Sequence, residues 1–205
     1  MSVSDKVVII TGGASGVGRF VAGTFAQAGA RVVVADVAPM DRVISEVEGM
    51  GAEILAVSTD VRIEDDVQDL MRQAQDRFGR IDVLINNAAI VTHFPGGGKT
   101  AWPLIRDMDE DFFENVIRTN LGGVYLGTKS AIPYMEAQGS GHIINIGQGN
   151  LNPATRTDNL GSCIYSMSKV AVQSFTNQVA PEEVEQIIMS HPAVDEAAII
   201  GIPDV

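Results

Sequence analysis

A glycine-rich turn between an apolar run and a helical pattern is the feature that most constrains the fold of this chain. Residues 7–10 read Val-Val-Ile-Ile, and a stretch with helical periodicity begins at Arg19. Between them lie Gly12, Gly16 and Gly18, in the pattern Gly-x-x-x-Gly-x-Gly. Glycines let the backbone turn tightly, and the free N–H groups at a helix N-terminus attract negative charge. The sequence therefore predicts a strand, a tight turn and a helix that together bind a phosphate group.

An acidic residue at the end of the second predicted strand strengthens this interpretation. Residues 31–35 are Arg-Val-Val-Val-Ala and lead into Asp36, roughly 20 residues beyond the glycines. A carboxylate at this place can bind the ribose hydroxyls of an adenosine. The two features together favour a dinucleotide site over the alternative, an ordinary β-α-β turn with an acid at a strand end.

Strand-like and helix-like segments alternate along the whole chain. Strands are expected at residues 6–11, 31–36, 53–58, 83–85 and 142–146, and helices at residues 19–28, 43–50, 65–78, 109–136 and 165–179. A break in the long helix is expected near Gly122 and Gly123. Such alternation predicts the α/β class, with a doubly wound parallel sheet of the Rossmann type and right-handed crossovers.

The composition excludes several classes of partner and site. The formal net charge of −12 argues against nucleic acids and anionic membrane surfaces as partners. Cys163 is the single cysteine, which excludes an internal disulfide and a thiolate metal cluster, and no metal site is expected. No apolar run is long enough to span a bilayer, and the chain begins directly with a strand. A cytoplasmic protein is the simplest expectation.

The pair Tyr165 and Lys169 is the strongest candidate for catalysis. Their i, i+4 spacing places both side chains on one face of a helix, one turn apart. A lysine ammonium beside a phenol favours the phenolate and lowers the pKa of the tyrosine. Such a tyrosine can take the proton of an alcohol while a hydride leaves, or return a proton to a carbonyl.

Taken together and in order, these motifs resemble the short-chain dehydrogenase/reductase family over about residues 1–179. The matching segments are residues 11–18, Asp36, Asp60-Val61, Asn86-Asn87-Ala88-Ala89, Thr119-Asn120-Leu121-x-Gly123, Ile144-Asn145-Ile146 and Tyr165-x-x-x-Lys169. The resemblance implies an NAD(P)-dependent oxidoreductase that interconverts a secondary alcohol and a ketone, with a small-molecule substrate. It also implies a homo-oligomer that pairs through the helices at residues 109–136 and 165–179.

The resemblance assigns a role to each matching residue. It implies that the pyrophosphate is held by Gly12, Ser15, Gly16, Val17 and Gly18. Asp60 and Val61 would contact adenine, and Asn87 would lie on the nicotinamide side. Tyr165 would be the acid/base, Lys169 would bind the nicotinamide ribose, and Asn120 would hold a water that links Lys169 to solvent. Asp36 predicts NAD over NADP, because a carboxylate repels a 2′-phosphate and Val37, Ala38 and Pro39 supply no arginine.

The segment after the fifth predicted strand departs from the family pattern. Where family members carry a serine that orients the substrate oxygen, this chain has Gln148. A glutamine amide can also donate a hydrogen bond, but it is longer and has no hydroxyl. Two interpretations stay open: a variant with modified substrate handling, or a weakened catalyst.

The end of the chain has a different character. Lys169 is the last Lys or Arg, and the segments at residues 180–185, 190–194 and 196–204 resemble the C-terminal subdomain of acyl-CoA synthetases and related adenylate-forming enzymes. The pattern predicts a chimera, in which a dehydrogenase core truncated near Val179 is joined to a synthetase-like fragment over residues 180–205. Gene rearrangement, an assembly error or deliberate construction would each give this pattern. A strand at residues 197–202 is expected to replace the family's sixth strand.

Two further functional classes stay beside the oxidoreductase interpretation. The chain could be a dinucleotide-binding module without efficient catalysis, or a hybrid gene product without selected activity. Turnover of secondary alcohols would separate the enzyme from both alternatives.

Overall fold

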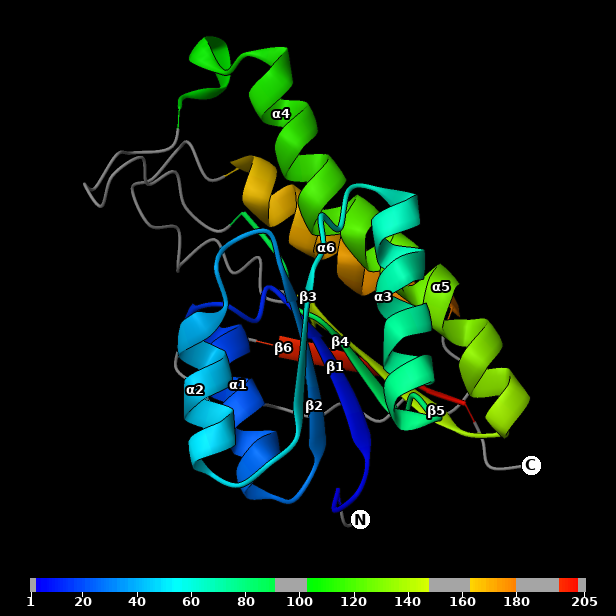
Figure 1. Ribbon diagram of the computed structural model, residues 1–205. Coiled ribbons are helices and arrows are strands. Elements are labelled where there is room, and N and C mark those ends of the chain that lie inside the picture. Colours follow the sequence, from blue (N-terminus) through cyan, green and yellow to red (C-terminus); the bar gives the residue numbers. More distant parts are fainter. Residues whose placement is uncertain (1–2, 91–102, 148–162, 180–195, 203–205) are drawn as a thin grey trace.

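The computed structural model describes residues 3–90, 103–147, 163–179 and 196–202 of the chain. A single sheet lies at the centre, with the strand order β3-β2-β1-β4-β5-β6 (Figure 1). Its parallel strands are β1 (Val7–Thr11), β2 (Arg31–Asp36), β3 (Ile54–Ser58), β4 (Val83–Asn86) and β5 (Gly141–Gly147). Each of the five strands predicted from the sequence is present, and the doubly wound α/β fold is confirmed.

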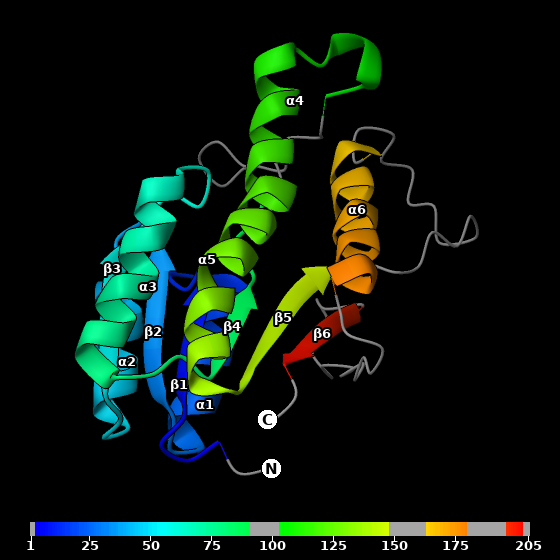
Figure 2. The same cartoon turned by 90° about the vertical axis from the view of Figure 1, so that its right-hand side faces the viewer.

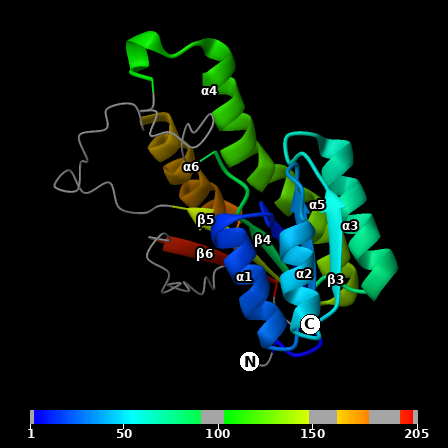
Figure 3. The same cartoon turned by 60° about the vertical axis from the view of Figure 1, so that its left-hand side comes forward.

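Helices cover both faces of this sheet. They are α1 (Gly16–Gln27), α2 (Asp41–Gly49), α3 (Glu64–Phe78), α4 (Glu110–Ile117), α5 (Gly123–Gln138) and α6 (Cys163–Val179). Figure 3 shows α1 and α2 side by side on one face, and Figure 2 shows α3 and α5 on the other. The helix pattern predicted from apolar periodicity is thereby confirmed.

The alternation of side chains along β1 explains why both faces are covered. Val8 and Ile10 pack with α1 and α2, whereas Val7 and Ile9 pack with α3 and α5. Successive side chains of a strand point to opposite faces, so an unbroken apolar strand must be buried on both sides. All five residues of β1 are buried. The apolar run that opens the chain thus dictates the position of β1 at the centre of the sheet.

The order in which strands are added to the sheet changes direction at β1. From β1 the chain first adds β2 and β3 on one side, and then returns to add β4 and β5 on the other. In open α/β sheets, ligands bind in the crevice beyond the carboxyl ends of the strands where the order reverses. The glycine-rich turn after Thr11 and the Asn86-Asn87 segment meet at this point, because β1 and β4 are adjacent.

The long helix predicted at residues 109–136 is interrupted where the sequence indicates a break. A short 3₁₀ turn, η2 (Ile105–Asp107), precedes α4, and a π-helical turn, η3 (Arg118–Gly122), joins α4 to α5. A π-turn inserts one residue into the helical register and is frequent at functional sites. Here it carries Asn120, whose side chain is fully buried.

The last strand is present, but its direction differs from the all-parallel prediction. β6 (Glu196–Ile202) lies beside β5 and runs antiparallel to it, with Glu196 opposite Gly147 and Ile202 opposite Gly141 (Figure 2). Apolar periodicity identifies a strand but not its direction, because the pattern is the same when it is read from either end. The sheet is therefore mixed, with five parallel strands and an antiparallel edge strand.

Candidate functional site

The glycine-rich turn brings α1 close to the ends of β1 and β4. A methyl group on Gly18 would collide with the carbonyl oxygen of Gly12 and would lie 2.7 Å from the Asn87 amide nitrogen. Gly12 has a φ of +67°, and a methyl group there would lie 2.8 Å from the Ala88 Cα. Only residues without a Cβ permit such a close approach. The predicted turn is thus confirmed in its geometry.

Gly16 serves a different purpose from Gly12 and Gly18. It begins α1 with a φ of +53°. Apart from its chain neighbours and the backbone of α1 itself, no atom of the described residues lies within 4 Å of the place that a Cβ would take. The open space faces the helix N-terminus, where Ser15 makes no side-chain cap hydrogen bond and the first turn holds no acid. The N–H groups of this turn are therefore available to an anion, as a pyrophosphate site requires.

Asp36 lies at the carboxyl end of β2 and is held by two backbone groups. Its Oδ2 accepts a 3.0 Å hydrogen bond from the Ala14 N–H, and its Oδ1 accepts a 3.0 Å bond from the Ala38 N–H. The first bond ties the carboxylate to the glycine-rich turn. The second bond holds the carboxylate over the segment that follows β2, which includes the exposed Val37.

The segment after β3 is built around an ion pair that the sequence analysis did not predict. Asp60 binds the Arg62 guanidinium through both carboxylate oxygens, at distances of 2.5 to 3.1 Å, and also accepts the Arg62 N–H. This pairing lowers the pKa of Asp60 and raises the pKa of Arg62, mainly through the side-chain hydrogen bond. Val61 is buried against Gly123 of α5. Asp60 and Val61 thus lie in the cleft, but the Asp60 carboxylate is already occupied.

Asn87 links the ends of the two central strands. Its amide nitrogen donates to the carbonyl oxygens of Thr11 and Gly12, at 2.8 and 3.2 Å, and its backbone N–H donates to the Thr11 hydroxyl. The Ala88 N–H donates to the same hydroxyl. These contacts hold the chain after β4 against the glycine-rich turn. Thr11 was part of the predicted motif, but its bridging role becomes visible only in the structure.

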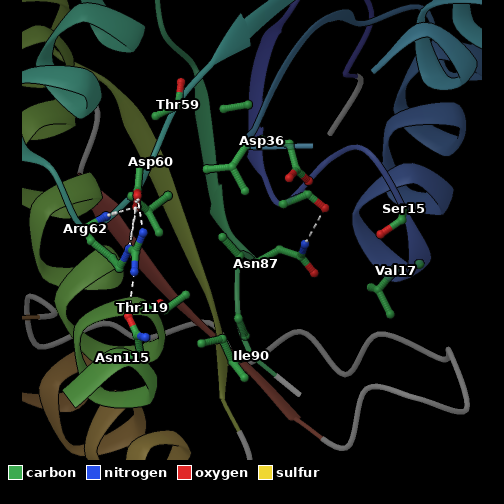
Figure 4. A pocket seen from close by; sticks show the side chains of 17 residues that line it. Ser15, Val17, Asp36, Thr59, Asp60, Arg62, Asn87, Ile90, Asn115 and Thr119 are labelled. Atoms are coloured by element: carbon green, nitrogen blue, oxygen red, sulfur yellow. Dashed lines mark hydrogen bonds and ion pairs between the residues drawn. The ribbon is translucent and has the colours of Figure 1, made fainter. Parts of the chain in front are cut away.

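These groups together line one cleft of about 500 Å³ at the carboxyl edge of the sheet (Figure 4). Its described walls are Gly12, Ser15, Gly16, Val17, Ala35, Asp36, Val37, Thr59, Asp60, Val61, Arg62, Asn87, Ala88, Ala89, Ile90, Asn115 and Thr119. All the predicted cofactor-binding residues of β1, β2, β3 and β4 line this cleft except Gly18, which is buried in the packing of α1. A free α1 N-terminus, an open glycine and a ribose-reaching carboxylate fit a dinucleotide.

Asn120 connects the site to α6. Its Oδ1 accepts the Ile90 N–H at 2.7 Å, and its Nδ2 donates to the Ile90 carbonyl oxygen at 3.1 Å. The same nitrogen donates to the Ser168 hydroxyl at 3.1 Å, and that hydroxyl donates to the Tyr165 carbonyl oxygen at 2.7 Å. The predicted water relay through Asn120 is not tested by these contacts. They show instead that Asn120 joins the chain after β4 to the helix of the candidate acid/base.

Tyr165 and Lys169 lie on one face of α6, as their spacing predicts. The Lys169 ammonium is 5.9 Å from the centre of the Tyr165 ring and donates a 2.5 Å hydrogen bond to the Ile146 carbonyl oxygen. Lys169 is 1% exposed, and this burial lowers its pKa to about 8. Gln148, predicted to orient the substrate, lies outside the described residues. The Lys169 ammonium is therefore close enough to influence the Tyr165 phenol electrostatically, and its hydrogen bond to Ile146 ties it to β5.

The sequence predicts neither a metal site nor a membrane-spanning segment, and the described residues bear on both predictions. No group of three or more His, Cys, Asp or Glu side chains is placed to hold a metal ion among the residues with a described position. Within the same residues, none of the helices is both long and apolar enough to cross a bilayer.

Contacts of three residues at the site, Arg62, Asn115 and Ser168, are not predicted from the sequence. Arg62 follows the predicted Asp60-Val61 pair directly, so its position in the motif was the available signal. Ser168 precedes Lys169 and lies on the α6 face that is turned toward Asn120. No sequence signal marks Asn115, because its contact with Arg62 joins residues on α4 and on the segment after β3.

Comparisons with known proteins agree with this site. The model of the family "short chain dehydrogenase" matches residues 6–192. The 3-oxoacyl-[acyl-carrier-protein] reductase FabG of Thermotoga maritima is 33% identical over 184 residues, which cover 89% of this chain and 70% of that protein. None of these matches shows the predicted synthetase-like segment, and the family match includes residues 180–192.

Solved structures give the same result. A short-chain type dehydrogenase/reductase from Mycobacterium marinum superposes with a TM-score of 0.76 at 30% identity, over 87% of this chain and 69% of that chain. A short chain dehydrogenase/reductase from Burkholderia phymatum, solved in complex with NAD, superposes with a TM-score of 0.72 at 30% identity, over 87% of this chain and 60% of that chain. By sequence match, sheet topology and site geometry, this chain belongs to the short-chain dehydrogenase family and is related to its oxidoreductases.

Proposed function

We propose that this protein is an NAD(H)-dependent oxidoreductase that interconverts a secondary alcohol and a ketone. The observation that carries the proposal is the buried Lys169 ammonium, 5.9 Å from the Tyr165 ring on α6. A titratable phenol beside a buried amine is suited to move a proton to or from a substrate oxygen. The ketone-reducing activity in the name of the Thermotoga relative supports the same reaction class.

The cleft residues supply the cofactor site in this proposal. Gly12, Ser15, Gly16 and Val17 would hold the pyrophosphate at the α1 N-terminus, with Gly18 allowing the helix to approach. Asp36 would bind the adenosine ribose, and its carboxylate would repel a 2′-phosphate. The Burkholderia neighbour, 30% identical to this chain, was solved with NAD, which supports this choice. When bound, NAD⁺ accepts a hydride from the alcohol carbon, and NADH returns it.

The proton follows a path set by the chain's own side chains. Tyr165 takes the hydroxyl proton as the alcohol carbon loses its hydride, so a C=O bond forms while the O–H and C–H bonds break. Lys169 favours the phenolate form of Tyr165 electrostatically and would bind the nicotinamide ribose. Asn120 would link Lys169 to solvent, and Asn87 would contact the nicotinamide side. Gln148 would orient the substrate oxygen in place of the family's serine.

An alternative function is a dinucleotide-binding module without efficient catalysis. Gln148 in the serine position favours it, since an amide carries no hydroxyl to polarise the substrate oxygen. A hybrid product without selected activity is the second alternative, and it rests on the change of character after Val179. In both alternatives the cleft of about 500 Å³ would bind the dinucleotide or lie unused, without turnover.

The assembly and the tail belong to this proposal as well. A homo-oligomer would pair through α4, α5 and α6, whose outer faces expose Phe113, Tyr125 and Met167. Residues 180–205 would derive from a synthetase-like C-terminal subdomain and supply β6 as a replacement edge strand. Sequencing of the transcript across codons 170–190 tests this origin, and a continuous dehydrogenase reading frame there would contradict it.

Spectroscopic assay of NAD⁺ reduction with a panel of secondary alcohols tests the proposed function. We expect turnover with NAD⁺ and at least one alcohol, and the reverse reaction with NADH and the matching ketone. Binding of NADH without turnover of any alcohol or ketone would favour the binding-module alternative. Absence of both binding and turnover would favour the hybrid product.

A further inference from the structure

Arg62 lies on the side of the cleft that is opposite the glycine-rich turn. Among the described residues that line the cleft, it is the one with a cationic side chain. Figure 4 shows Arg62 and Asn115 on one side of the cleft and Ser15 and Val17 on the other, with Asp36 between them. Arg62 is thus placed at the end where the resemblance puts the adenine, and away from the phosphates.

The guanidinium group of Arg62 is fixed in position by groups on two elements. Its Nε and Nη2 donate to Asp60 after β3, and its Nη1 donates to the Asn115 Oδ1 of α4 at 2.5 Å. The Arg62 side chain is nevertheless 40% exposed, whereas that of Asp60 is 18% exposed. A planar group that is held at its edge by hydrogen bonds leaves its face free for contact.

The same contacts limit what Asp60 can do. Its Oδ1 accepts from the Arg62 N–H and Nε–H, and its Oδ2 accepts from Nε–H and Nη2–H. An ionised carboxylate has about four lone-pair sites, so these donors occupy most of its capacity. A 6-amino group of adenine would have to compete with these Arg62 donors for the remaining capacity of the Asp60 carboxylate. The predicted contact of Asp60 with adenine therefore has a competitor in the protein itself.

We propose that the Arg62 guanidinium, and not the Asp60 carboxylate, is the residue that recognises adenine, by stacking its face on the purine ring. This inference rests on the proposed function, because it concerns the base of the dinucleotide. Arginine planes stack on nucleobases in a way that every purine accepts, since each has a π-face. Asp60 and Asn115 act as positioning residues that hold the guanidinium plane.

The charge balance at this end favours a flat neutral ring over an additional phosphate. Asp60 neutralises the guanidinium at short range, so an incoming anion would meet a carboxylate as well as a cation. Apolar surface from Val37 and Val61 also lines the cleft. A neutral aromatic ring can use both the apolar surface and the guanidinium face, which a phosphate cannot.

A base-modified cofactor separates the two modes of recognition without any mutation. Reduced nicotinamide hypoxanthine dinucleotide carries an oxygen in place of the 6-amino group and a proton on N1, and it keeps the purine rings and their π-faces. If Arg62 stacks on the base, the parent protein binds this analogue and NADH with dissociation constants within about threefold of each other. If Asp60 accepts a bond from the 6-amino group, the analogue binds at least about tenfold more weakly, and that result overturns the proposal.

Variants of Arg62 supply the second test. Arg62→Ala should weaken binding of the hypoxanthine analogue roughly tenfold. It should leave unchanged the affinity for reduced nicotinamide mononucleotide, which lacks the adenosine half. Arg62→Lys keeps the positive charge but has no planar guanidinium group, so its affinity for the analogue should fall nearly as far as that of Arg62→Ala. Arg72→Ala is the matched control, because Arg72 also pairs with two carboxylates, Asp69 and Asp76, but lies on α3 outside the cleft walls.

The outcomes are distinct from those that decide the proposed function. Unchanged affinity of Arg62→Ala for the analogue overturns the inference while the oxidoreductase proposal stands. If Arg62→Ala loses the same affinity for the analogue and for the mononucleotide, Arg62 has a merely structural role, and the inference is overturned as well. If the parent protein binds neither NADH nor the analogue, the proposed function itself fails.

Discussion

The Asn120 amide nitrogen donates a 3.1 Å hydrogen bond to the Ser168 hydroxyl and so joins the π-helical turn η3 to α6. Both side chains are completely buried. Asn120 also binds the backbone N–H and carbonyl oxygen of Ile90, and Ser168 binds the Tyr165 carbonyl oxygen. The distance between the chain after β4 and the helix that carries Tyr165 is therefore set by two side chains.

Ser168→Ala should lower kcat by roughly tenfold and leave the dissociation constant of NADH nearly unchanged. The substitution removes a hydrogen-bond partner from the Asn120 amide, so the free energy of unfolding should fall by about 1–2 kcal/mol. Steady-state kinetics, NADH titration and urea unfolding measure these effects. Ser174→Ala, at an exposed position of the same helix, is the control. It should change neither kcat nor the free energy of unfolding. Equal kcat values for parent and Ser168→Ala would show that this contact does not position Tyr165.

Asp36→Asn should narrow the preference for NADH over NADPH. The asparagine keeps the size of the side chain and one acceptor oxygen, but it removes the charge that repels a 2′-phosphate. We expect the parent to bind NADH at least about tenfold more tightly than NADPH, and the variant to reduce this ratio. Fluorescence titration with both nucleotides measures the ratio. Equal affinities in the parent protein would contradict the assignment of NAD.

Gly18→Ala should destabilise the protein by about 2 kcal/mol or more and abolish NADH binding, because the new methyl group would meet the Gly12 carbonyl oxygen. Gly23→Ala, on the same helix, is the matched control. There the nearest atom to a new Cβ is the flexible Met50 Cε, at 3.6 Å, so the higher helix propensity of alanine should stabilise the protein by roughly 0.5–1 kcal/mol. Thermal and urea unfolding of both variants measure these changes in stability. Equal stability of the two variants would contradict the close approach of α1 to the glycine-rich turn.

The buried Lys169 predicts a specific dependence of stability on pH. Burial lowers its pKa in the folded protein to about 8, below the ordinary value of 10.5. Between these values the folded protein binds fewer protons than the unfolded chain, so the free energy of unfolding rises as the pH increases. Relative to Lys169→Met, the parent should gain about 2 kcal/mol between pH values of about 8 and 10.

Urea unfolding of both proteins across this pH range is the measurement. Since other groups titrate in both proteins, the difference between the two curves reports Lys169. A difference that does not change with pH would mean that the folded protein keeps Lys169 charged at its ordinary pKa.

Tyr165→Phe should abolish turnover and leave NADH binding nearly intact, because the ring is kept and the titratable hydroxyl is lost. The expected loss in kcat is at least about a thousandfold. Tyr134→Phe is the control, since Tyr134 lies on α5 against the core and away from the cleft. Activity that survives Tyr165→Phe would place the proton transfer on another group.

The helices and strands, and the chemistry of short motifs, could be predicted from local sequence patterns alone. The apolar runs predicted β1 to β5, and most clearly the central strands β1 and β2, because a strand buried on both faces must be apolar throughout. The glycine spacing predicted the turn after Thr11, and the Tyr165–Lys169 spacing predicted their common face on α6, because both depend on local backbone geometry. The break near Gly122 was likewise readable, although its form as a π-turn was not.

Contacts between segments that lie far apart in the chain became known from the three-dimensional structure. The antiparallel direction of β6 is set by its pairing with β5, which periodicity does not encode. The Arg62 contact with Asn115 and the Asn120 contact with Ser168 join residues 53 and 48 positions apart. Such contacts depend on how the helices pack across the sheet, and no local pattern marks them. The sequence thus determined which groups could act, while the packing decided which of them meet and, at Asp60, which one is already occupied.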